Sequence, residues 1–191
     1  MTSTVTTRHR LPLRPGLHAR IVLAALSAGS LAALGWTSFA QPAVHVVYNP
    51  SDSVPPGWYR ITPASAAPLP VQVGSIVLVR LPAETAALAA QRGYLPAHIP
   101  LLKRVGAVAP QHVCIENREL RIDDVRAAAL LAADRLGRPL PAWKQCRLLA
   151  DGELFLLGTT NPASFDSRYF GPVLASAVIG TAQPVQQERW P

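Results

Sequence analysis

The sequence is poor in cysteine, lysine and charged residues. It has two cysteines, and its cysteines and histidines form no cluster with the spacing of metal ligands, which argues against a metal site. Charged residues make up 15% of the 191 residues, and four of the seven net positive charges lie within residues 1–20. The rest of the chain has no dense basic stripe, so the composition excludes a nucleic-acid interface.

Lysine is the rarest charged residue, because 16 of the 18 basic residues are arginine and only Lys103 and Lys144 are lysine. Lys103 stands inside the apolar stretch 101–106, LLKRVG. A lysine amine can lose its proton when it is buried, whereas an arginine stays charged. We therefore interpret Lys103 as an amine that is used in its neutral form; a lysine that extends from a strand edge to solvent is the alternative.

Residues 21–40 contain no charge over twenty positions, which is long enough to cross a bilayer as a helix. The basic tail 1–20 precedes this stretch, and that order predicts a cytoplasmic tail and an exported domain at 41–191. We expect a retained transmembrane anchor at 21–40. Because the small residues at 38 and 40 also fit a cleavage site, a removed signal segment is the alternative.

The exported part is predicted to be one mainly β domain. Its 19 prolines and 12 glycines, counted over the whole chain, favour turns and short strands over a helix bundle. One short helix is predicted at 84–92, and residues 125–136 fit either helix or strand. Strands are predicted at 44–48, 57–61, 75–81, 99–108, 112–116, 119–123, 154–157 and 173–179.

Cys114 and Cys146 are the two cysteines, and both fall in the exported part. Two cysteines in an exported domain usually form a disulfide, so we expect this pair to be bonded. The alternative is two buried free thiols.

A serine turn lies at residues 49–57, NPSDSVPPG. In an extended segment Ser51 and Ser53 point to the same side, and the surrounding prolines restrict the backbone. A hydroxyl held in place before substrate arrives suits a nucleophile, so we expect Ser53 to attack. The Ser51 hydroxyl and the Ser53 N–H would then form an oxyanion hole. A proline-rich surface loop with incidental serines is the alternative.

The base and its supports are predicted from two other segments. Lys103 shares an apolar strand face with its neighbours at i±2, and burial lowers the pKa of a lysine amine. A neutral amine can accept the proton of the Ser53 hydroxyl. In the stretch 158–172, GTTNPASFDSRYFGP, period-two spacing places Ser164, Asp166 and Arg168 on one face. Ser164 is expected to bond the lysine amine, and Asp166 with Arg168 to form a supporting ion pair.

In this order the three segments resemble the type I signal peptidase family, and most closely its TraF-type conjugative transfer peptidases. The resemblance implies a signal-peptidase-like, coiled or barrel-like β fold and an acyl-enzyme mechanism without cofactor or metal. It also implies a pilin-like or other exported precursor as substrate, an inner-membrane anchor and a periplasmic catalytic domain. The resemblance assigns Ser53 as nucleophile and Lys103 as base, with Ser51, Ser164, Asp166 and Arg168 in support.

Two departures separate this chain from general leader peptidases: Val54 stands in place of methionine, and Thr159 in place of aspartate. A general leader peptidase is therefore an alternative, as is a mating-channel assembly protein with a vestigial site. A Ser–His–Asp triad and a self-cleaving LexA-type protein are weaker alternatives. The histidines lie in no motif, and the chain has an apolar span where LexA-type proteins carry a DNA-binding head. Val54, Trp58 and Tyr59 are expected at the site as substrate or lipid contacts, or in the core. Substrate identity, hydrolysis against cyclisation, and oligomeric state are left open.

Overall fold

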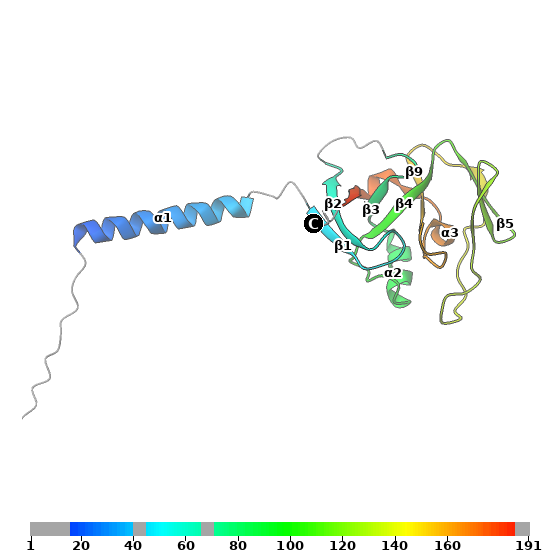
Figure 1. The fold of residues 1–191 in the computed structure, drawn as a ribbon, viewed down its shortest axis with the longest axis horizontal. Helices are drawn as coiled ribbons and strands as arrows, with labels where there is room; N and C mark the ends of the chain where they lie inside the picture. Colours follow the sequence, from blue (N-terminus) through cyan, green and yellow to red (C-terminus); the bar gives the residue numbers. More distant parts are fainter. Residues whose placement is uncertain (1–15, 40–44, 66–70, 186–191) are drawn as a thin grey trace, which may run out of the picture. The chain divides into compact units, whose positions relative to one another are not determined.

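The computed structural model describes residues 16–39, 45–65 and 71–185. The chain divides into two units, residues 1–42 and 43–191, and the only helix described in the first is α1 at Leu17–Phe39 (Figure 1). In the described ranges, no helix combines the length and apolar character needed to cross a membrane, so the span expected at 21–40 stays a prediction. Most of the predicted basic tail, the last residue of the predicted span (40) and the start of the exported part (41–44) lie outside the described residues.

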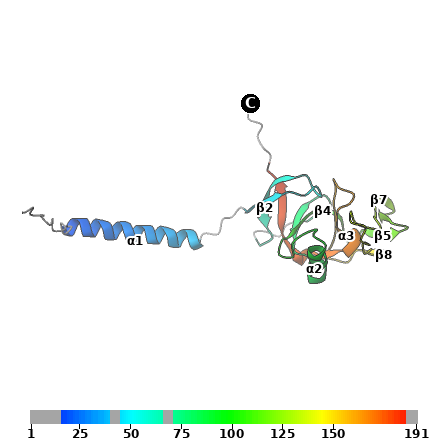
Figure 2. The ribbon, with the colours of Figure 1, turned by 90° about the horizontal axis from the view of Figure 1, so that it is seen from below.

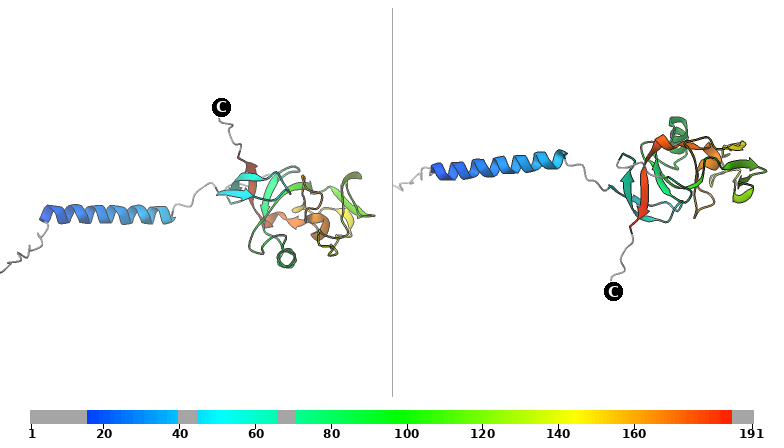
Figure 3. Two further views of the ribbon diagram at one scale, coloured as in Figure 1. Left: turned by 60° about the horizontal axis from the view of Figure 1, so that its bottom comes forward. Right: turned by 90° about the horizontal axis from the view of Figure 1, so that it is seen from above.

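The second unit is built on a seven-stranded antiparallel sheet with the order β1-β2-β11-β3-β4-β9-β10. Figure 3 shows the late strand β11 beside β2, two segments that lie far apart in the sequence. The late strand therefore holds the first hairpin against the middle of the sheet. The strands are β1 His45–Asn49, β2 Gly57–Pro63, β3 Ile76–Val79, β4 Leu101–Val108, β9 Glu153–Leu157, β10 Val173–Leu174 and β11 Val178–Pro184.

A smaller antiparallel sheet, in the order β7-β6-β5-β8, lies at one end of the domain (Figure 2). The predicted hairpin is confirmed: Asn117 and Arg118 both have positive φ and join two strands. Residues 125–136 begin as a strand, which resolves the ambiguity of that stretch. The strands are β5 His112–Glu116, β6 Glu119–Ile122, β7 Val125–Ala129 and β8 Cys146–Leu148.

Two α-helices and one 3-10 turn accompany the sheets within residues 45–185. The predicted helix is confirmed as α2, Ala83–Gln91, which is followed by Gly93 at a φ of 71°. The one-turn helix α3, Ser167–Phe170, was not predicted, because four residues are too short to show a helical period. The 3-10 turn η1 spans Ala175–Ala177.

The core next to the serine turn includes two residues that were expected at the site as substrate or lipid contacts, or in the core. Val54 and Tyr59 are 0% and 1% exposed and pack with Leu102 of β4. For these two, the structure favours the core over a contact with lipid. Trp58 is half exposed and lies against Tyr48, with the ring centroids 5.1 Å apart. Val54 therefore fixes the serine turn against the strand that carries Lys103.

Candidate active site

The serine turn between β1 and β2 is organised by the buried amide of Asn49. Its Nδ2 donates to the backbone oxygens of Ser51 (2.8 Å), Val54 (3.1 Å) and Pro55 (3.4 Å). Its Oδ1 accepts from the N–H of Ser51 at 3.2 Å and from the Ser51 hydroxyl at 2.8 Å. One side chain thus closes the whole turn, which is the role an asparagine commonly takes at such positions.

Ser51 and Ser53 lie on the same side of the turn, as predicted. Their hydroxyl oxygens are 3.1 Å apart, and Ser53 is 7% exposed while Ser51 is open to solvent. Because the single Ser51 proton goes to Asn49, the Ser53 hydroxyl is the donor between the two serines. The backbone N–H of Ser53 donates no hydrogen bond within the described residues, so it is free to bind an oxyanion.

Lys103 lies on β4 opposite Val77 of β3 and is 3% exposed. Burial lowers its pKa to about 8; the charges of Asp166 and, more weakly, Asp52 oppose this change, while Arg168 adds to it. The amine donates a hydrogen bond to the Ser164 hydroxyl. At mildly alkaline pH, therefore, a large share of Lys103 is neutral and able to take a proton.

Asp166 and Arg168 form a buried ion pair in which Nε and Nη2 each reach one carboxylate oxygen at 2.8 Å. The arginine also donates to the backbone oxygens of Ser164, Pro162 and Ala129 at 3.0, 3.0 and 2.7 Å. Two-pronged pairing of this kind fixes both side chains in one geometry. The pair therefore ties the segment that carries Ser164 to the end of β7 in the smaller sheet.

The arrangement of this segment differs in one respect from the prediction. Period-two spacing was expected to place Ser164, Asp166 and Arg168 on one face, but Asp166 instead caps the N-terminus of α3. Ser167, which the alternating pattern placed on the opposite face, is fully buried and its hydroxyl accepts from the N–H of Leu156 at 2.9 Å. The cap, rather than strand alternation, brings the acid and the arginine together.

Gly158 permits the closest approach at the site. Its N–H donates to Asp166 at 2.8 Å, and a Cβ at this position would lie 2.4 Å from the Ser164 Oγ. Any side chain would displace the hydroxyl that orients Lys103. The sequence signal was present, since this glycine opens the segment that carries Ser164, but no role was predicted for it.

Residues 158–164, here called the bridging loop, hydrogen-bond both the serine turn and Lys103. The Thr159 N–H donates to the backbone oxygen of Ser53 at 2.8 Å, and at the other end of the loop the Ser164 hydroxyl accepts from Lys103. In the described chain, Lys103 bonds Ser164 and makes no hydrogen bond to Ser53. The structure thus gathers all six predicted residues into two hydrogen-bonded groups, Ser51–Ser53 and Lys103–Ser164–Asp166–Arg168, which the loop holds together.

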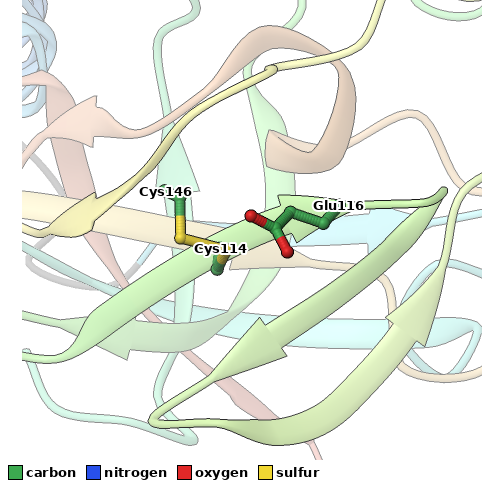
Figure 4. Close-up of side chains that lie close together, drawn as sticks. All are labelled: Cys114, Glu116 and Cys146. Atoms are coloured by element: carbon green, nitrogen blue, oxygen red, sulfur yellow. A yellow bond between two sulfur atoms is a disulfide. The ribbon is translucent and has the colours of Figure 1, made fainter.

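The predicted cysteine pair is bonded and lies in the smaller sheet, between opposed positions of β5 and β8. Figure 4 shows the carboxylate of Glu116 near the two sulfurs, the one grouping of possible metal ligands among the described residues. Because both sulfurs of Cys114 and Cys146 are in the disulfide, they do not offer thiolate ligands. We therefore assign the pair a structural role.

Comparison with known proteins identifies the family of this chain. A sequence profile of signal peptidases, peptidase S26, matches residues 18–186. The plasmid transfer protein TraF of Escherichia coli is 30% identical over 178 residues, which cover 87% of this chain and 93% of TraF. The conjugal transfer protein TraF of Agrobacterium fabrum is 35% identical over 151 residues, covering 68% and 82% of the two chains.

Among solved structures, a signal peptidase I from Enterococcus faecalis covers 58% of this chain and 94% of its own, with 20% identity and a TM-score of 0.36. Because the profile spans nearly all of the described residues and the TraF relatives align over most of their length, the family is clear. The chain belongs to the signal peptidase family S26 and is a TraF-type, signal-peptidase-like protein.

Proposed function

We propose that this protein is a membrane-associated serine endopeptidase that cleaves a pilin-like precursor during conjugative transfer. One observation carries the proposal: Lys103 is buried, has a pKa lowered to about 8, and is bonded through Ser164 to the loop that holds the Ser53 turn. A lysine with that pKa has the properties of a general base. The names of the relatives, plasmid and conjugal transfer proteins, support the biological setting.

The first chemical step forms an acyl-enzyme. The Ser53 oxygen attacks the scissile carbonyl carbon while its proton passes to the Lys103 amine. The Ser51 hydroxyl and the Ser53 N–H hold the resulting oxyanion. As the C–N bond breaks, the protonated Lys103 gives its proton to the leaving amine, which restores the neutral base.

The second step resolves the ester by one of two nucleophiles. Attack by water releases a linear product, whereas attack by the amino terminus of the same substrate releases a cyclic one. In each case Lys103 takes a proton from the nucleophile and returns it to the Ser53 oxygen. The two products differ by the mass of one water, so they can be told apart directly.

The hydroxyl groups of Ser51 and Ser53 must both rotate when substrate binds, before the acylation step. The Ser53 proton points to Ser51, and the Ser51 proton points to Asn49. To react, Ser53 must turn its proton toward Lys103, and Ser51 must turn its own toward the substrate oxygen. Hydroxyl rotations of this size are local, and catalytic hydrogen bonds commonly tighten only when substrate is bound.

The proposed location is the inner membrane, with the catalytic domain in the periplasm. The uncharged stretch 21–40 after a basic tail supports an anchor, and the Cys114–Cys146 disulfide supports an oxidising compartment. We expect the full-length protein to stay with the membrane fraction after extraction with alkaline carbonate. If residues 1–40 are removed as a signal segment, the same extraction will release the domain.

The test is intact-mass analysis of a pilin-like precursor from the same transfer region, co-expressed with the wild type, Ser53→Ala or Lys103→Ala. The proposal expects shortening by the wild type alone. A product lighter than the linear fragment by one water identifies cyclisation, and the linear mass identifies hydrolysis. Equal processing by all three proteins would refute the assigned nucleophile and base. Processing of many unrelated preproteins would instead favour a general leader peptidase.

A further inference from the structure

Asp52, the residue between the two serines, bonds to the bridging loop. Its carboxylate accepts from the Asn161 side-chain amide at 2.7 Å, and its backbone oxygen accepts from the Thr160 hydroxyl. A third bond runs from the Thr159 N–H to the backbone oxygen of Ser53. Three consecutive loop residues therefore hydrogen-bond two consecutive turn residues. We call this set of three hydrogen bonds the loop clamp.

The loop clamp fixes the two peptide planes on either side of Ser53. A peptide group is rigid and planar, so holding its C=O also sets the direction of its N–H. The C=O of Asp52 belongs to the same peptide as the Ser53 N–H, which is the proposed oxyanion donor. The Thr160 hydroxyl therefore aims that donor, and Thr159 fixes the peptide that follows the nucleophile.

The loop clamp also connects the serine turn to the base, through Asn161 and Ser164. The backbone oxygen of Asn161 accepts from the N–H of Ser164 at 3.1 Å, and Ser164 in turn accepts from Lys103. Asn161 closes its own turn as well, because its Oδ1 accepts from the Ala163 N–H at 2.8 Å. The path from Asp52 to Lys103 therefore runs through Asn161 and Ser164, each step a hydrogen bond or a peptide.

We infer that Asp52, Thr160 and Asn161 are positioning residues, which aim the Ser53 N–H at the oxyanion and hold the nucleophile at a fixed distance from Lys103. The inference rests on the proposed peptidase function. None of the three side chains needs to touch the reacting atoms. Their effect is large because a misplacement of about 1 Å at a reacting group can cost on the order of a hundredfold in rate.

Asp52 has a second effect, through its charge. The charged groups that act on Lys103 are Asp166 and Arg168 from the segment at α3, and Asp52 from the serine turn. The carboxylate of Asp52 raises the pKa of Lys103 and so opposes the effect of burial. Without that charge the amine loses its proton at a lower pH, and activity should appear at a lower pH too.

The test uses the full-length protein in detergent and p-nitrophenyl N-acetylalaninate, an activated ester with a small acyl group, as the probe. Thr160→Val and Asn161→Ala each remove one bond of the clamp and keep the charge of Asp52. Asp52→Asn keeps an acceptor for Asn161 and removes the charge. Matched controls far from the site are Thr62→Val, which removes an exposed hydroxyl, and Asp151→Asn, which removes an exposed charge.

We expect Thr160→Val and Asn161→Ala to lower kcat by roughly 10- to 100-fold, with little change in KM and no change in the midpoint of the pH profile. Thr160→Ser should recover most of the lost rate. Asp52→Asn should move the midpoint of the pH profile to lower pH than in the wild type. The two control variants should match the wild type in both respects.

A second readout does not depend on turnover. The Thr159 amide donates to the backbone oxygen of Ser53, and the other two bonds of the clamp hold that contact in place. Hydrogen exchange at this amide should therefore be faster in Thr160→Val and Asn161→Ala than in the wild type. Rates within twofold of the wild type in both clamp variants would overturn the positioning inference, and an unmoved midpoint in Asp52→Asn would overturn only the charge effect of Asp52. If the wild type released p-nitrophenol no faster than Ser53→Ala, the proposed function itself would fall, and the inference with it.

Discussion

In the proposed mechanism, one buried amine sets the pH dependence of acylation. Burial lowers the pKa of Lys103 from 10.5 to about 8, and the reaction needs this amine in its neutral form. The rate should therefore rise with pH through a single titration, with a midpoint near 8, and reach a plateau above it. At acid pH the rate of acylation should fall because Lys103 gains a proton.

The size of the effect follows from the two pKa values. With a pKa of about 8, roughly a tenth of Lys103 is neutral at pH 7; with a pKa of 10.5, about 0.03% would be neutral. Burial therefore increases the working fraction of the base about 300-fold at neutral pH. Lys103→Arg removes this advantage, because arginine stays protonated over the whole range.

The assay is kcat/KM for p-nitrophenyl N-acetylalaninate between pH 5 and about 10, with the rate of Ser53→Ala subtracted at each pH. The free-enzyme titration appears directly in such a profile. A midpoint near 8 that is absent from Lys103→Arg agrees with lysine as the base. A profile that is flat through the acid range, or one whose midpoint lies near 6.5 as for an ordinary histidine, would refute the assignment.

Three further predictions concern the residues that support the site. Gly158→Ala should reduce acylation at least as much as Thr160→Val, measured by p-nitrophenol release, since its Cβ would occupy the space of the Ser164 hydroxyl. Asp166→Asn leaves a buried arginine charge unpaired and should lower the free energy of unfolding by about 3–5 kcal/mol, measured by urea denaturation. Replacing Cys114 and Cys146 together by serine should lower it by about 3–4 kcal/mol, from the loop of 32 residues that the bond closes, while acylation at a temperature well below unfolding stays within a few-fold.

The parts of the fold that the sequence predicts well are those with a local signal. The alternating strands, the hairpin at Asn117-Arg118 and helix α2 each follow from a period or a turn motif in a few residues. The seven-strand order could not be predicted in the same way. It depends on β11 pairing with both β2 and β3, a long-range choice that no local pattern encodes.

The residues of the candidate site also differ in whether the sequence carries a local signal for them. Ser51, Ser53, Lys103 and Ser164 could be proposed because a hydroxyl or an amine in an unusual setting suggests its own chemistry. Residues that act by hydrogen bonding to these groups carry no such signal. They are ordinary turn residues, and their partners are known only once the fold is known; they are Asn49, Asp52, Gly158, Thr160 and Asn161.

A 3-10 turn at Ala175–Ala177 divides the strand predicted at 173–179, and cap geometry explains the local structure around Asp166. Period-two spacing predicted that Ser164, Asp166 and Arg168 share a face, but Asp166 is a preferred N-cap residue and begins a helical turn. The turn still brings Arg168 back to the carboxylate, so the predicted ion pair forms by a different path. The ion pair was predicted correctly, and the helical turn that forms it was not predicted.

The most direct test of the central claim is to find the atom that carries the acyl group. The full-length wild type, Ser53→Ala and Lys103→Ala are mixed with p-nitrophenyl N-acetylalaninate, quenched in acid within the first turnover, and analysed by intact mass and peptide mapping. The account predicts one acyl group on Ser53 in the wild type, none in Ser53→Ala, and much slower loading in Lys103→Ala. An acyl group on another residue, or equal loading of the wild type and Lys103→Ala, would contradict a Ser53–Lys103 mechanism.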